Sequence, residues 1–403
     1  MEANYATVDE TISATLHSVR TLLGMQFAFI AEFKDGRRVF RFVDRAADAP
    51  PILCTGGSDL LEDSYCQRVV DGRLPELMQD ARQNPEALTL PVTMALPVGA
   101  HLSVPLRFSN GFVYGTFCCF SLFPDVTLNS RDIRTLRLFA EMTGKLMEQQ
   151  LERNHSHQLI VQRLQEVMSA GEYNIVYQPI VQLARHEIIG YEALTRFSGE
   201  PVRTPDVWFN EAAEVNLQEE LELVTISKAL QGLTHLPGDT YLSLNASPAT
   251  IVKPSLTRLL AGYPLDRLML EVTEHTSVDD YARMIEAIRP LRACGMKLAV
   301  DDAGAGYASF RHILKLQPDI IKLDISLIRQ IDSHTECRAL AGALIRFAEE
   351  TGSKVVAEGV ETVEELQALR KLEVNNAQGY LLGRPASLDA LPTRPACTVM
   401  QGG

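Results

Sequence analysis

Basic residues are scarce in this chain, which has 38 Lys and Arg against 51 Asp and Glu in 403 residues, a formal net charge of −13. A long nucleic acid is therefore an unfavourable partner, because proteins bind its phosphate backbone through basic surfaces. A small, doubly charged nucleotide is compatible with this composition, since clustered carboxylates can hold divalent cations that attract phosphate.

Cysteine pairs with metal-binding or redox spacing are also missing. The chain has no Cys-x-x-Cys sequence, and Cys118 and Cys119 lie together in an apolar run. This pattern is typical of a reduced, cytoplasmic protein, and most of the cysteines are interpreted as small buried hydrophobic residues. The seven cysteines are Cys54, Cys66, Cys118, Cys119, Cys294, Cys337 and Cys397.

No segment has the sequence of a membrane-spanning helix. Residues 88–106 and 108–124 lack Asp, Glu, Lys and Arg, but prolines and glycines interrupt both segments as helices. The β-branched and aromatic residues at 112–120 instead predict the central strand of a sheet. The first eleven residues are polar and acidic, unlike a signal peptide. We therefore expect no membrane association.

The composition is that of a soluble globular protein, with 46% hydrophobic and 22% charged residues, and 403 residues exceed one ordinary core. Residues 1–150 are predicted to form an α+β domain, in which Asn110-Gly111 is a hairpin turn between strands at 102–108 and 112–120. A helix beginning at Asn129 or Ser130 leads into a helical connector at 151–165. This connector is interpreted as either a dimer seam that transmits a signal or a plain solvated linker.

Residues 166–395 form the predicted second domain, where short β-rich runs alternate with helical stretches. This alternation predicts an α/β fold with a mainly parallel sheet, closed into a TIM-like (β/α)8 barrel. The predicted strands are Ile175–Ile180, Ile188–Arg196, Tyr241–Asn245, Leu268–Glu274, Lys297–Asp302, Asp319–Ile325, Lys354–Glu358 and Gln378–Leu382.

Polar residues stand at the ends of nearly all these strands, and a barrel brings those ends to one mouth. They are Glu192, Asn245, Glu271, Glu274, Asp301, Asp302, Lys322, Asp324, Glu358 and Gln378. Clustered acids raise one another's pKa values unless cations neutralise them. The set lacks His and Cys, so it favours hard ions such as Mg²⁺ or Mn²⁺, with Ca²⁺ as an alternative. Each acid taken alone is also compatible with an ordinary surface carboxylate.

Two features of this set constrain the local structure. Asp301 and Asp302 would point to opposite faces of a regular strand, so the strand must turn if both are to reach a metal ion. Gly304 and Gly306 allow such a turn. Lys322 is interpreted either as a structural counter-ion or as a group that positions water or stabilises charge on a phosphate.

These motifs resemble those of the EAL phosphodiesterases, a family that hydrolyses cyclic di-GMP to linear pGpG. The resemblance covers about residues 160–390. It rests on Gln178-Pro179-Ile180, Glu192-Ala193-Leu194-Thr195-Arg196, Asn245, Glu271-Val272-Thr273-Glu274, Asp301-Asp302, Lys322-Leu323-Asp324, Glu358-Gly359-Val360-Glu361, Gln378-Gly379-Tyr380 and Gly383-Arg384-Pro385.

The resemblance implies two ions, Mg²⁺ or Mn²⁺, in each active site. The implied ligands of the first ion are Glu192, Asn245, Glu271 and Asp301, and those of the second are Asp301, Asp302 and either Asp324 or Glu358. The implied catalytic residues, which position or activate the attacking water, are Lys322, Glu358 and Asp302. The implied substrate-binding residues are Gln178, Leu194, Arg196 and Gln378. Gln178, Leu194 and Arg196 could each instead pack the barrel mouth.

The loop after the paired aspartates departs from the family pattern, because Ala303 stands where phenylalanine is usual. Glu274 matches the family glutamate that secures this loop. The departure leaves the ligands untouched, so it concerns rate, regulation or dimer contact rather than substrate class.

The first domain more weakly resembles a GAF sensor domain, through Leu102-Ser103-Val104-Pro105-Leu106 and Gly115-Thr116-Phe117-Cys118. Binding of an unknown small ligand and dimerisation around an empty pocket are both compatible with it. A covalent bilin is disfavoured, because this half has no Cys-His pair that resembles the attachment site.

We therefore expect a cytoplasmic, homodimeric, metal-dependent cyclic di-GMP phosphodiesterase that its first domain regulates. The alternative is a non-catalytic cyclic di-GMP receptor that signals to a protein partner. Another cyclic dinucleotide or phosphodiester is an alternative substrate.

Overall fold

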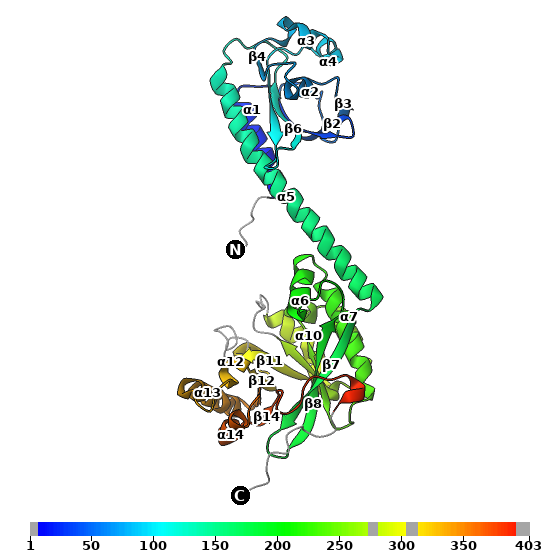
Figure 1. Ribbon diagram of the computed structural model, residues 1–403, viewed down its shortest axis with the longest axis vertical. Helices are drawn as coiled ribbons and strands as arrows, with labels where there is room; N and C mark the ends of the chain where they lie inside the picture. Colours follow the sequence, from blue (N-terminus) through cyan, green and yellow to red (C-terminus); the bar gives the residue numbers. More distant parts are fainter. Residues whose placement is uncertain (1–6, 273–280, 304–312, 392–403) are drawn as a thin grey trace. The chain divides into compact units, whose positions relative to one another are not determined.

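The computed structural model describes residues 7–272, 281–303 and 313–391. Contacts divide the chain into two compact units, Met1–Ser156 and His157–Gly403. The division falls inside the predicted connector, within the single helix α5 (Ser130–Ala170) (Figure 1). None of the helices in these described ranges has the length and apolar composition that a membrane crossing requires.

The first unit is built on a six-stranded sheet with the order β3-β2-β1-β6-β5-β4, in which every pairing is antiparallel. The predicted β5–β6 hairpin is present, with Gly111 at φ 83° in its turn. The elements are α1 (Val8–Leu22), β1 (Phe27–Lys34), β2 (Arg37–Arg45), β3 (Ser58–Leu60), α2 (Tyr65–Val70), β4 (Leu77–Met78), α3 (Pro85–Leu88), α4 (Pro91–Ala95), β5 (His101–Arg107) and β6 (Val113–Phe120).

Both faces of this sheet are buried, because side chains along a strand alternate between its faces. On β6, Cys119 lies in the core cluster that includes α1 and α5 residues. Its neighbour Cys118 lies in the opposite cluster, with Tyr65 and Cys66 of α2. The two adjacent cysteines therefore have different surroundings.

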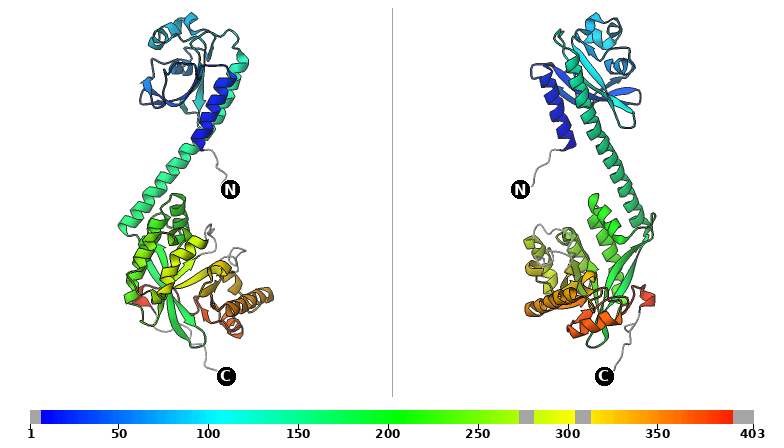
Figure 2. Two further views of the ribbon diagram at one scale, coloured as in Figure 1. Left: turned by 180° about the vertical axis from the view of Figure 1, so that it is seen from behind. Right: turned by 60° about the vertical axis from the view of Figure 1, so that its left-hand side comes forward.

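The second unit, coloured from green to red in Figure 2, is a closed eight-stranded barrel, as the sequence predicted. The order of its strands is β10-β11-β12-β13-β14-β7-β8-β9. Its strands are β7 (Tyr173–Gln182), β8 (Glu187–Phe197), β9 (Tyr241–Asn245), β10 (Leu268–Val272), β11 (Lys297–Ala303), β12 (Ile320–Leu323), β13 (Lys354–Ala357) and β14 (Asn376–Ala377). Its helices are α6 (Pro205–Glu214), α7 (Gln218–Gln231), α8 (Pro248–Ile251), α9 (Pro254–Leu260), α10 (Tyr281–Ala293), α12 (Ile325–Ile328), α13 (Thr335–Thr351) and α14 (Val363–Lys371).

One barrel strand runs against the others. β7 pairs antiparallel with both β8 and β14, while the remaining barrel pairs are parallel. Only residues 183–186 separate β7 from β8, too few for the crossover that parallel strands need. The first two predicted β-rich runs therefore form a hairpin rather than a strand-helix-strand unit.

The prediction of a last strand at Gln378–Leu382 was wrong. The strand is Asn376–Ala377, and Gln378 follows it directly. Residues 379–383 form a turn instead, in which the N–H groups of Leu382 and Gly383 donate to the Gly379 carbonyl at 3.0 Å. The error in position leaves Gln378 at a strand end, as expected.

Candidate active site at the barrel mouth

An apolar layer inside the barrel lies below a polar one. The buried residues of the apolar layer are Ile180, Met269, Ala299, Ile320 and Val356. Two positions further along four of these strands stand Glu271, Asp301, Lys322 and Glu358. Because strand side chains repeat with period two, these four residues follow the apolar layer on the interior side, toward the carboxyl ends of the parallel strands.

Lys322 is the cationic centre of this polar layer and is only 1% exposed. Its Nζ lies 2.7 Å from a carboxylate oxygen of Glu271 and 2.7 Å from one of Glu358. Asp301 follows at 3.3 Å and Glu192 at 3.6 Å. One ammonium group therefore faces four carboxyl groups that successive strands bring together.

The acids respond to this crowding in different ways. Burial, which outweighs the charge of Lys322, raises the pKa of Glu271 to about 8. Burial and the charge of Asp301 raise the pKa of Glu358 well above its ordinary value. Burial opposes ionisation of Glu192 too, but Lys322 and hydrogen bonds from Gln378 and Asn245 lower its pKa. The site therefore has more carboxyl groups than its own cation can neutralise.

Hydrogen bonds hold Glu192 from both sides. Asn245 Nδ2 donates to one of its oxygens at 3.0 Å, and Gln378 Nε2 donates to the other at 2.6 Å. The same Gln378 nitrogen lies 3.0 Å from Gln178 Oε1, and Gln178 Nε2 donates to the Gly383 carbonyl at 3.2 Å. The predicted substrate-binding residues Gln178 and Gln378 are thus buried neighbours of Glu192.

The strand turns at Asp302, as the adjacent aspartates require. Asp302 has φ 56°, in the left-handed region, and the β11–β12 register shifts between Val300 and Ala303. As a result, ligand atoms of Asp301, Asp302 and Glu358 lie within 4.8 Å of one another. Ala303 itself is fully buried in the core.

These residues fit a divalent cation. The donors are carboxylate and amide oxygens, which hard ions prefer, and the surplus of buried carboxyl groups needs positive charge. Within the described ranges, Gln378 Oε1 is also a buried acceptor without a hydrogen-bond partner. Asp324 and Glu358 are the alternative ligands for the second ion. The geometry favours Glu358, because Asp324 caps α12 by accepting from the Ser326 N–H at 2.9 Å.

A pocket of about 650 Å³ adjoins this site, and Asn245 and Asp302 belong to its wall. The predicted substrate-binding residues Leu194 and Arg196 also line it. Arg196 is exposed, and its Nη1 donates to the Thr195 carbonyl at 2.9 Å. Glu274, Gly304 and Gly306 lie outside the described residues.

Two polar residues at the site were missed by the sequence reasoning. Ser243 Oγ donates to Glu271 at 2.5 Å, from the position on β9 two residues before Asn245. Glu222 of α7 lines the pocket, and its carboxylate accepts the Ser247 N–H at 3.0 Å and the Ser247 hydroxyl at 3.1 Å. The Ser243 position could have been found from strand periodicity, whereas Glu222 gave no signal.

Known proteins resemble more than half of the chain. The chain is 33% identical over 237 residues to an uncharacterized signaling protein of Caulobacter vibrioides, covering 57% of this chain and 29% of that protein. It is 32% identical over 257 residues to the cyclic di-GMP phosphodiesterase NbdA of Pseudomonas aeruginosa, covering 59% of this chain and 33% of NbdA. The chain thus spans about a third of the length of these relatives.

A solved structure has the same fold. The PaMucR phosphodiesterase, in complex with c-di-GMP, has a TM-score of 0.52 and 26% identity, covering 57% of this chain and 98% of that one. Residues 7–146 match the GAF domain family. Residues 161–385, more than half of the chain, match the EAL domain family. The chain therefore belongs to the EAL domain family, with a GAF domain preceding its TIM-like barrel.

Proposed function

We propose that this chain hydrolyses cyclic di-GMP to linear pGpG in a reaction that depends on divalent metal. The observation that carries the proposal is the cluster of four carboxyl groups around Lys322, next to a pocket of about 650 Å³. Relatives named as cyclic di-GMP phosphodiesterases support this substrate and reaction.

The proposed metal ligands are divided between two ions, Mg²⁺ or Mn²⁺. They are Glu192, Asn245, Glu271 and Asp301 for one ion, and Asp301, Asp302 and Glu358 for the other, with Asp324 as the alternative to Glu358. When bound, such ions supply positive charge for phosphate oxygens and lower the pKa of a water.

The remaining roles belong to the chain's own side chains. Lys322 and Glu358, whose Nζ and carboxyl oxygen lie 2.7 Å apart, position the attacking water together with Asp302. Gln378 keeps Glu192 in place by donating a hydrogen bond to it, and Gln178 accepts from the same Gln378 nitrogen. In the pocket, Arg196 is suited to bind a phosphate through paired N–H groups, and Leu194 packs against the nucleotide.

Chromatography of the purified full chain with cyclic di-GMP, with Mg²⁺ or Mn²⁺ and with EDTA as control, tests this proposal. Metal-dependent formation of pGpG is the expected result. Tight binding without turnover would instead support the alternative of a non-catalytic cyclic di-GMP receptor. Preferential hydrolysis of a different cyclic dinucleotide would change the proposed substrate.

The proposal extends to regulation and setting. We infer that the GAF domain controls the phosphodiesterase, with a small ligand or dimerisation as its input, and that the working protein is a cytoplasmic homodimer. The six cysteines in the described part of the chain are all free, which is compatible with a reducing compartment.

A further inference from the structure

Two thiols from separate elements meet in the core of the GAF domain. Cys66 of α2 and Cys118 of β6 are each fully buried, and their sulfur atoms lie 3.5 Å apart. A disulfide bond needs about 2.05 Å, so this pair is close to bonding distance. The sequence reasoning interpreted both residues as small hydrophobic residues.

The surroundings make the two thiols chemically unequal. Arg38 Nη1 donates to Cys66 Sγ at 3.2 Å, while Cys118 Sγ lies within hydrogen-bond distance of two hydroxyl groups, Ser103 Oγ at 3.0 Å and Thr116 Oγ1 at 3.2 Å. Burial opposes ionisation of Cys66, but the hydrogen bond with Cys118 and the charge of Arg38 lower the pKa of Cys66 to about 6. Burial raises the pKa of Cys118 well above its ordinary value. The contact with Arg38 thus favours the thiolate form at Cys66 over Cys118, which makes Cys66 the nucleophilic member of the pair.

A small cavity of about 40 Å³ lies next to Arg38, and neither Cys66 nor Cys118 belongs to its wall. Arg38, which contacts Cys66, lines it with Tyr65 and His101. His101 Nδ1 is buried without a hydrogen-bond partner among the described residues. Since a water occupies roughly 10–15 Å³ on this measure, the cavity accommodates a small polar molecule of the size of hydrogen peroxide. The positive charge of Arg38 disfavours a metal cation at the same place.

We propose that Cys66 and Cys118 form a peroxide-reactive dithiol that closes to a disulfide. The Cys66 thiolate attacks one oxygen of hydrogen peroxide, the O–O bond breaks, and Cys66 becomes a sulfenic acid while hydroxide leaves and takes up the proton that Cys66 released on ionising, forming water. Cys118 then attacks the Cys66 sulfur, its proton goes to the departing hydroxyl group, and a second water is released. In sum, two thiols are oxidised and one peroxide is reduced to two waters.

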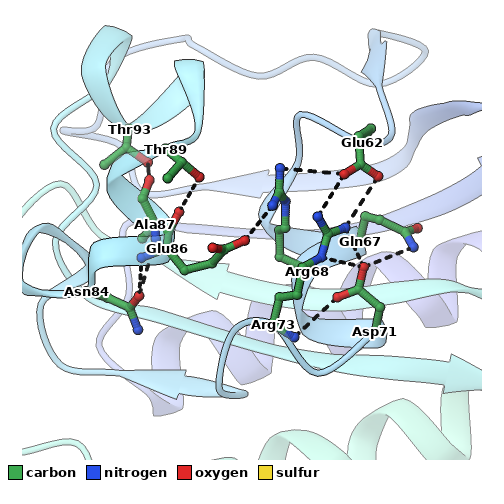
Figure 3. Close-up of polar contacts among 10 residues, drawn as sticks. All are labelled: Glu62, Gln67, Arg68, Asp71, Arg73, Asn84, Glu86, Ala87, Thr89 and Thr93. Atoms are coloured by element: carbon green, nitrogen blue, oxygen red, sulfur yellow. Dashed lines mark hydrogen bonds and ion pairs between the residues drawn. The ribbon is translucent and has the colours of Figure 1, made fainter.

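The anchoring of α2 favours closure by side-chain rotation. Figure 3 shows Arg68 of α2 paired with Glu86 and with Glu62, the latter at 3.5 Å. The same Glu62 binds Arg73 at 2.8 Å, just after the helix. Because the Arg68–Glu86 pair holds α2 against α3, and the two sulfur atoms are already 3.5 Å apart, the disulfide is expected to form without unfolding of the domain.

Peptide mapping of the full chain tests the proposal. Reduced protein receives one equivalent of hydrogen peroxide, free thiols are then blocked with a maleimide, and peptides are analysed without reductant. The expected product is a peptide pair joined through Cys66 and Cys118, which dithiothreitol separates. The proposal would be overturned if the maleimide labels Cys66 and Cys118, which shows that they are still reduced, in a sample in which peroxide has oxidised the exposed Cys54 and Cys294.

Three variants sharpen the test, and each is checked for folding by circular dichroism. Cys118→Ser should leave a sulfenic acid at Cys66 that dimedone traps, whereas Cys66→Ser should leave none at Cys118. Cys119→Ser is the matched control, because Cys119 is equally buried but lies on the opposite face of β6. Its disulfide yield should equal that of the wild type. Equal dimedone labelling of Cys66 and Cys118 in the two single variants would contradict the assigned roles.

Discussion

Glu192 has more partners than a structural carboxylate needs. It receives hydrogen bonds from Asn245 and Gln378 and lies 3.6 Å from Lys322. We expect Glu192→Ala to lower kcat by about 100-fold or more, because it removes a proposed metal ligand, while the fold persists. Formation of pGpG and thermal unfolding measure the two effects. Glu350→Ala, an exposed change on α13, is the control, and wild-type turnover in Glu192→Ala would refute the ligand assignment.

Glu222 is expected to act through another residue. Its carboxylate holds Ser247, two residues beyond the proposed ligand Asn245. Glu222→Ala leaves the buried Ser247 N–H unpaired, while the Ser247 hydroxyl keeps its contacts with Thr250, and the unpaired N–H costs about 1–3 kcal/mol of unfolding free energy. We also expect a higher metal concentration at half-maximal activity, which Glu222→Gln should partly restore. An unchanged metal requirement in Glu222→Ala would limit this residue to stability.

Glu222 also gives the protein a pH dependence of defined sign. Burial raises its pKa above the ordinary 4.5, so the folded chain holds this proton more tightly than the unfolded chain does. As pH rises above about 4.5, ionisation therefore favours the unfolded chain. The melting temperature of Glu222→Gln minus that of the wild type should grow between pH 4.5 and pH 7. A constant difference would show that Glu222 titrates normally.

Residue types at strand ends predicted most of the site. The acids and Lys322 were recognisable because strand order and barrel closure bring such ends together. The contribution of Glu222 could not be predicted, because a glutamate in an amphipathic helix is normally exposed and its burial depends on how α7 packs. The sequence also predicted that the chain turns at the paired aspartates. The sequence reasoning attributed this turn to Gly304 and Gly306, which lie outside the described residues. In the structure, Asp302 adopts the left-handed conformation.

At the level of elements, strand identity was more predictable than strand direction. The β7–β8 hairpin has no Asn-Gly or Asp-Gly turn, and its link at 183–186 contains His186 at φ 57° instead. β14 was misplaced because Asn376 and Ala377 have little β propensity, and only their position between β13 and β7 makes them a strand.

Gly190 allows a close contact between strands β8 and β9. A Cβ added to Gly190 of β8 would lie 2.6 Å from the Tyr241 ring of β9. We expect Gly190→Ala to lower the unfolding free energy of this unit by about 1–3 kcal/mol through overpacking. Gly238→Ala is the control, since nothing lies within 4 Å of its added Cβ. Urea unfolding measures both variants, and equal midpoints would show that Tyr241 moves aside freely.

At the level of the whole molecule, each unit has its own hydrophobic core. We therefore expect two unfolding transitions in calorimetry. Mn²⁺ should raise only the barrel transition, because a ligand that binds the folded site at 100 times its Kd stabilises that unit by about 2.7 kcal/mol. The shift should vanish with EDTA and shrink in Glu192→Ala. Equal shifts of both transitions would place metal binding elsewhere.

The buried ammonium of Lys322 also has a consequence for the life of the protein in a cell. Because it already pairs with Glu271 and Glu358, the barrel has an internal substitute for part of the missing positive charge when metal is scarce. A chain without bound metal ions would then stay folded, although inactive, instead of being degraded. Recovery of its activity would require only the binding of metal ions, without new protein synthesis or refolding by chaperones.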